Sequence, residues 1–181
     1  MSILHTVLDL SSGVLRLMGL YGPALNVLDR VLALDSKNAL ALRIKGQVLM
    51  ALKQPQEAVA ALQQASTLTT DLSQVHVELS AALRALGRYE EALAALERAL
   101  ESKPQDAKTL SAKGEVLRIL GRYTDALAAL DQALALKGND PYALATKGQV
   151  LRALKRNDEA ATALLRAVEL DPKLELSLIH I

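Results

Sequence analysis

The chain has 181 residues, of which 51% are hydrophobic, and this share comes almost wholly from Leu, Ala and Val because there is no Phe, no Trp and only four Tyr. Its 21 basic and 20 acidic side chains leave a net charge of +1, so no whole-chain field favours nucleic acid or a membrane. The absence of cysteine excludes disulfides, thiolate zinc sites and cysteine nucleophiles, and fits a cytoplasmic protein.

The first residues carry no basic leader, and their apolar run is broken at Asp9, which is unlike a secretory signal. Nowhere do about 18 uncharged apolar residues follow one another, so we expect no membrane-spanning helix.

Over nearly its whole length the chain repeats itself with a period of 34 residues. Small residues return at Ser12, Gly46, Ser80, Gly114 and Gly148. Alanines return at Ala24, Ala58, Ala92, Ala126 and Ala160, and leucines at Leu28, Leu62, Leu96, Leu130 and Leu164. A fixed period of this length indicates a repeat array, in which each repeat cannot bury its apolar face alone.

Within one repeat, Leu110 and Leu117 recur at helical spacing, Gly121 interrupts the pattern, and Leu127 and Leu134 resume it. This pattern predicts two antiparallel helices joined by a tight turn. Gly121 stands where the first helix must end, which favours a left-handed cap there.

The mid-helix glycines need a packing reason, because glycine costs about 1 kcal/mol against alanine inside a helix. We predict that the partner helix of the same repeat approaches closely at Gly46, Gly114 and Gly148.

These residues resemble the tetratricopeptide repeat, a helix-turn-helix of this length with a small residue at its eighth place, Ala at its twentieth and twenty-seventh, and a large apolar residue at its twenty-fourth. The resemblance implies an all-α, right-handed α-solenoid in one array. Its five repeats would cover residues 5–38, 39–72, 73–106, 107–140 and 141–174.

Two features depart from the family. Leu occupies the fourth place in every repeat but the third, which has His76, and the eleventh place in all five; the family often has Trp and Tyr there, so we expect an aliphatic core. Leu176 to Ile181, in the tail 175–181, resembles the translation of a transposon end sequence used to prepare sequencing libraries. We interpret it as an adapter artefact, after which the natural protein would continue past Glu175; the alternative is the first turn of a capping helix.

No catalytic or metal constellation is apparent. His5, His76 and His180 lie in different repeats or in the tail, and His76 takes a leucine position of the repeat, which favours a packed core histidine. Glu90, Glu91, Asp158 and Glu159 open second helices, where the helix dipole favours carboxylates. We therefore expect no enzyme activity, cofactor, metal or small-molecule substrate.

The resemblance also implies which side chains line the concave face, namely the second, fifth, ninth, twelfth and thirteenth of each repeat. The predicted partner-binding residues are Arg16, Arg43, Gln47, Met50, Arg84, Lys108, Glu115, Arg118, Tyr142, Gln149 and Arg152. Four of them are arginines at the twelfth place and form a predicted basic stripe.

Guanidinium groups pair with carboxylates in two-pronged geometry, so the stripe favours an acidic or C-terminal peptide, unless it only solvates the helices. The predicted function is a non-catalytic protein-protein interaction scaffold that binds a peptide or partner helix. The alternative is a recognition or regulatory arm of a larger enzyme or signalling protein. Nucleic-acid binding along the arginine stripe is a third and weaker hypothesis, because stacking aromatics are absent and the net charge is near zero.

Overall fold

A computed structural model describes residues 18–69 and 72–174 of the chain. The predictions for Arg16 and for the tail at 175–181 lie outside these residues. The chain divides into two compact units, an N-terminal unit at residues 1–99 and a C-terminal unit at residues 100–181, and each is described by itself.

Every regular element of the described residues is an α-helix, as predicted. The first helices of the repeats are α3 (Ala39–Ala51), α5 (Leu72–Ala85), α7 (Ala107–Ile119) and α9 (Pro141–Ala153). The second helices are α2 (Tyr21–Leu34), α4 (Pro55–Leu68), α6 (Tyr89–Ser102), α8 (Tyr123–Leu136) and α10 (Asn157–Leu170).

The helices begin and end where local chemistry satisfies their backbone. Asn38 accepts a hydrogen bond from the Ala41 N–H at 2.9 Å, and Asp106 accepts one from the Thr109 N–H at 3.0 Å, so each side chain caps a first helix. The predicted left-handed cap is present at Gly121, with φ of 74°. Lys53 adopts the same left-handed conformation with φ of 60°. A residue with a Cβ atom adopts this conformation less readily than glycine does.

The two helices of a repeat meet at the predicted glycine seam. A Cβ atom placed on Gly46 would lie 2.5 Å from Cγ of Leu62, and one on Gly114 would lie 2.5 Å from Cγ of Leu130. These positions have no room for a side chain, so the prediction of close helix approach is confirmed.

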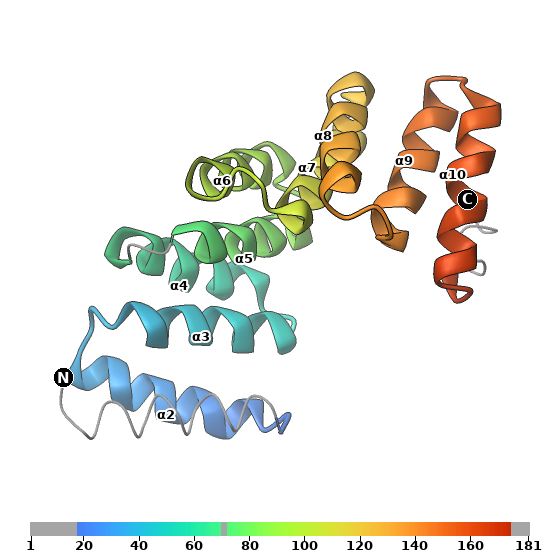
Figure 1. Ribbon diagram of the computed structural model, residues 1–181. Coiled ribbons are helices and arrows are strands. Elements are labelled where there is room, and N and C mark those ends of the chain that lie inside the picture. Colours follow the sequence, from blue (N-terminus) through green and yellow to red (C-terminus); the bar gives the residue numbers. More distant parts are fainter. Residues whose placement is uncertain (1–17, 70–71, 175–181) are drawn as a thin grey trace. The chain divides into compact units, whose positions relative to one another are not determined.

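Successive helices stack on one another within each unit. In the N-terminal unit α2 packs on α3, α3 on α4 and α4 on α5, and α3 also contacts α5 (Figure 1). In the C-terminal unit α7 packs on α8, α8 on α9 and α9 on α10, and α7 also contacts α9. The core between the stacked helices of each unit is aliphatic, as expected. Its completely buried residues include Leu28, Leu62, Leu96 and Leu130.

Candidate protein-interaction surface

In the N-terminal unit the predicted binding residues of α3 are half-buried: Arg43, Gln47 and Met50. Arg43 lines a pocket of about 250 Å³ at the start of α3 and α5, together with Leu40 and Gln74. Leu40 and Gln74 occupy the second place of their repeats, and Arg43 the fifth. Predicted inward side chains of two consecutive first helices are thus brought together here.

A hydrogen bond joins the same two helices one turn further along. The Gln47 amide donates to Oε1 of Glu78 at 2.6 Å, and Gln74 donates to the same oxygen at 3.3 Å. Gln47 is therefore engaged with α5 in this structure. Arg84, which is half-buried near the end of α5, is the only member of the predicted arginine stripe described in this unit.

In the C-terminal unit the predicted residues lie on α7 and α9, which contact each other. Their exposure differs: Lys108, Tyr142 and Arg152 are exposed, whereas Glu115, Arg118 and Gln149 are half-buried. Within the described residues, Nε of Arg118 is buried and donates to no acceptor. A buried donor without an acceptor carries a free-energy cost, and an incoming oxygen would relieve it.

His76 is a structural residue, as its leucine position predicted. It is buried, with 4% of its surface exposed, and its Nδ1 lies 2.7 Å from the carbonyl oxygen of Leu72. Across residues 18–69 and 72–174, no group of three or more His, Cys, Asp or Glu side chains is arranged to hold a metal ion.

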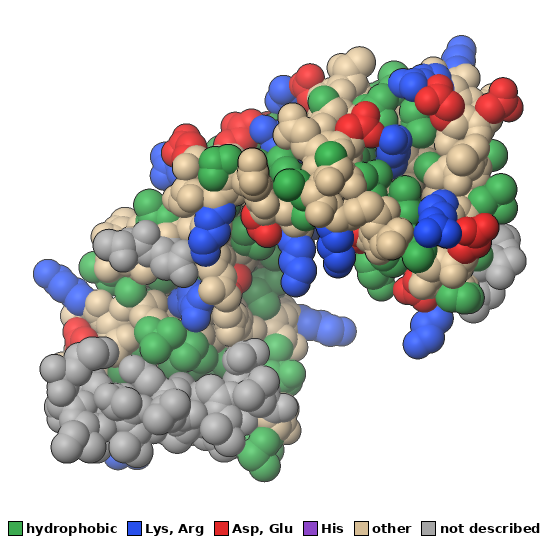
Figure 2. All heavy atoms as spheres, viewed as in Figure 1, with side chains coloured by type: hydrophobic (Ala, Val, Ile, Leu, Met, Phe, Trp, Pro, Cys, Tyr) green, Lys and Arg blue, Asp and Glu red, His purple; other side chains and the backbone are tan. Residues whose placement is uncertain are grey.

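The lysines that precede two of the mid-helix glycines, Gly46 and Gly148, form ion pairs that sequence reasoning missed. Lys45 binds Asp29 of the preceding helix at 2.7 Å, and Lys147 binds Asp131 at 2.6 Å. The acid stands 16 residues before its lysine in both cases, and this recurrence was the signal in the sequence. Acidic and basic side chains accordingly lie interspersed over α9 and α10 (Figure 2).

The stacked helix pairs define a helical-repeat solenoid, and the comparisons with known proteins agree. A family model described as tetratricopeptide repeat matches residues 77–143 and 120–175, and the chain belongs to this family. A model described as anaphase-promoting complex, cyclosome, subunit 3, matches residues 17–99. Among curated protein sequences, none matches the chain.

Solved structures share the fold at low sequence identity. MamA (residues 41 to the end) from Desulfovibrio magneticus RS-1 is 19% identical, with a TM-score of 0.86 over 96% of this chain and 98% of that one. YrrB, titled a TPR protein with an unusual peptide-binding site, is 22% identical, with a TM-score of 0.79 over 93% and 87%. PilF of Pseudomonas aeruginosa is 18% identical, with a TM-score of 0.81 over 92% and 76%.

Family membership supports a role as a protein-interaction scaffold. None of the helices in the described parts of the chain is both long enough and apolar enough to cross a membrane.

Proposed function

We propose that this protein is a non-catalytic scaffold whose first helices bind a peptide or partner helix, and that its arginines select an acidic segment or a C-terminal carboxylate. The observation that carries the proposal is the buried Arg118 Nε, which donates to no acceptor within the described residues. Charge-assisted hydrogen bonds from a guanidinium to a carboxylate are about twice as strong as neutral ones. A carboxylate bound at Arg118 would supply the missing acceptor.

Two further features, one in each unit, support a peptide ligand. Arg43, Leu40 and Gln74 offer a cation, an apolar surface and an amide around one pocket, which suits an extended peptide with mixed side chains. In the C-terminal unit, Tyr142 is 64% exposed on α9, and it offers an apolar body with a polar tip.

The test uses a peptide array that carries acidic peptides with a free C-terminal carboxylate and the same peptides with an amidated C-terminus. The array is probed with the parent protein and with the Arg84→Ala/Arg118→Ala variant. We expect the parent to prefer acidic sequences and the double variant to bind at least about tenfold more weakly, because hydrogen bonds to charged groups are worth roughly 1.5–3 kcal/mol each.

The matched control is Arg30→Ala/Arg98→Ala, which removes two exposed arginines from second helices and leaves the same net charge. This control should bind like the parent. If the Arg84→Ala/Arg118→Ala variant binds the acidic peptides as well as the parent does, the arginines only solvate their helices and the proposal is wrong.

A further inference from the structure

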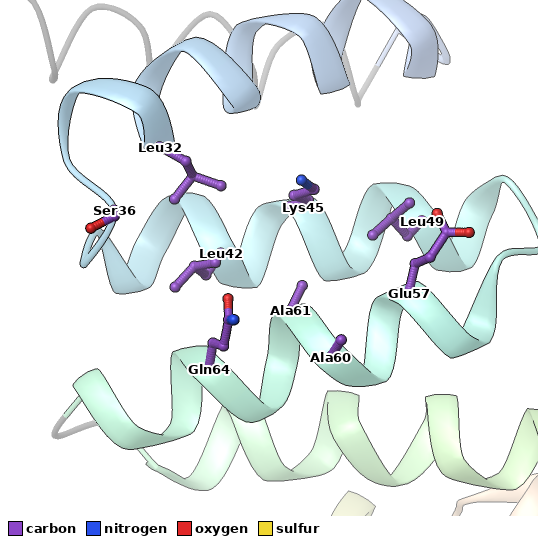
Figure 3. Close-up of a pocket in the computed structure, with 9 residues that line it drawn as sticks. All are labelled: Leu32, Ser36, Leu42, Lys45, Leu49, Glu57, Ala60, Ala61 and Gln64. Atoms are coloured by element: carbon purple, nitrogen blue, oxygen red, sulfur yellow. The ribbon is translucent and has the colours of Figure 1, made fainter.

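A second surface lies on the other side of α3. A groove of about 390 Å³ runs between α2, α3 and α4, with Ser36 at one end and Leu49 beside Glu57 at the other (Figure 3). Its apolar lining includes Leu32, Leu42 and Ala61. Lys45 lines this groove, and Arg43 lines the pocket of about 250 Å³ described above. Two residues along a helix correspond to a rotation of about 200° around its axis. The two sites are therefore separate.

The same groove recurs in the C-terminal unit. There a groove of about 330 Å³ is lined by Leu144, Lys147, Leu151 and Glu159, which stand three repeat lengths after Leu42, Lys45, Leu49 and Glu57. In both grooves the lysine already binds an aspartate of the preceding helix. Neither lysine is therefore available to pair with a ligand at no cost.

The two grooves differ in the state of their carboxylate. Arg156 binds Glu159 through two hydrogen bonds, at 2.7 and 2.6 Å. Gln54 occupies the place of Arg156 in the earlier repeat, and among the described residues Glu57 has no ion pair or hydrogen bond. The N-terminal groove therefore presents an exposed, uncompensated carboxylate beside Leu49.

The opposite end of the N-terminal groove also has a different side chain from the C-terminal groove. Gln64 lines the N-terminal groove where Arg166, which binds Glu169 at 2.9 Å, lines the C-terminal one, so a neutral amide replaces an ion-paired arginine. With Lys45 paired to Asp29, Glu57 is the one charge of the groove lining that lacks a counter-ion among residues 18–69 and 72–174. Its ligand should thus be apolar in the body and positive at the Leu49 end.

From this charge pattern we infer that the groove binds a protein segment in which an aliphatic side chain stands next to a lysine or arginine. The aliphatic side chain packs on Leu42, Leu49 and Ala61, and the cation pairs with Glu57. This site goes beyond the acidic-peptide surface proposed above, because it lies on a different face of α3 and selects the opposite charge.

The test is a titration of the isotopically labelled full chain, followed by NMR, with N-acetyl-Leu-Lys-amide, N-acetyl-Leu-Glu-amide and N-acetyl-Gly-Lys-amide. We expect the Leu-Lys compound to bind most tightly and to shift the amide signals of Leu49, Glu57 and Ala61. Glu57→Gln should weaken this binding by roughly two- to fivefold, which is the range for an exposed ion pair.

Gln54→Arg provides a second, independent variant. It restores the arginine found in the later repeats, so Glu57 would bind it and be lost to the ligand, and affinity should fall as in Glu57→Gln while the fold is kept. Glu159→Gln is the matched control in the C-terminal groove and should leave the shifts around Leu49 unchanged.

Three outcomes would overturn the inference: no shifts around the groove at saturating compound, equal binding of the Leu-Lys and Leu-Glu compounds, or equal binding by the parent and both variants. Concentration-dependent self-association that Glu57→Gln abolishes would assign the groove to a second copy instead. None of these results depends on the arginines tested for the acidic-peptide surface.

Discussion

At the scale of single residues, the mid-helix glycines set how closely two helices approach. A Cβ on Gly114 would meet Cγ of Leu130 at 2.5 Å, and Leu130 is completely buried. Gly114→Ala gains about 1 kcal/mol of helix propensity but overpacks the seam at a cost of about 1–3 kcal/mol. We expect a net loss of about 1 kcal/mol in the free energy of unfolding, measured by urea denaturation.

The control is Gly138→Ala, in the loop after α8, where the nearest atom to an added Cβ is the Leu134 carbonyl oxygen at 3.6 Å. That distance is an ordinary contact, so stability should change by less than about 0.5 kcal/mol. A Gly114→Ala variant more stable than the parent would show that the seam is looser than described.

At the scale of an element, a repeated ion pair marks the start of the second helices. Arg88 binds Glu91 through two hydrogen bonds of 2.6 Å, and these hold the pKa of Glu91 below its ordinary value, against an opposing effect of desolvation. A carboxyl whose pKa is lowered by folding stabilises the fold above its unfolded-state pKa, and this contribution disappears as the pH falls through the folded-state pKa.

We therefore expect Arg88→Gln to raise the pKa of Glu91 toward its ordinary value, measured by carbon-13 NMR of the side-chain carboxyl. The variant should also lose less stability than the parent on acidification. Arg98→Gln removes an arginine within α6 and serves as control, because Arg98 is not among the groups that shift the pKa of Glu91. An unchanged Glu91 pKa in Arg88→Gln would mean that the pair is absent in solution.

The elements also show how far the sequence can predict this molecule. The period places Gly46 against Leu62 because each repeat carries a small residue, Gly or Ser, at the place of Gly46 and Leu at the place of Leu62, so helices, turns and seam could all be predicted. The arginine stripe stays a prediction, because it depends on which side chains a ligand meets. The groove at Glu57 could not be predicted, since its volume depends on what three helices leave unfilled.

The Lys45–Asp29 pair was missed for a related reason. Its spacing of 16 residues crosses a turn and lies outside the three- and four-residue spacings that bring side chains together within one helix. Only the stacking of α2 on α3 makes the two residues neighbours.

At the scale of the whole molecule, packing is local, because the contacts described in each unit join consecutive helices or the first helices of consecutive repeats. In such an array stability is approximately a sum of repeat terms and nearest-neighbour terms, so damage should stay near its origin. Leu28 is completely buried in α2, and Leu28→Ala should cost about 2–5 kcal/mol.

We expect Leu28→Ala to reduce amide hydrogen-exchange protection most in α2 and α3, less in α4 and α5, and hardly at all in α9 and α10. Leu151→Ala, at an almost completely buried leucine of α9, is the reciprocal variant and should reduce protection in α9 and α10 first. An equal loss in both units from either substitution would show one all-or-none folding unit. The graded result would instead mean that each stretch of stacked helices keeps its fold when a distant stretch is damaged.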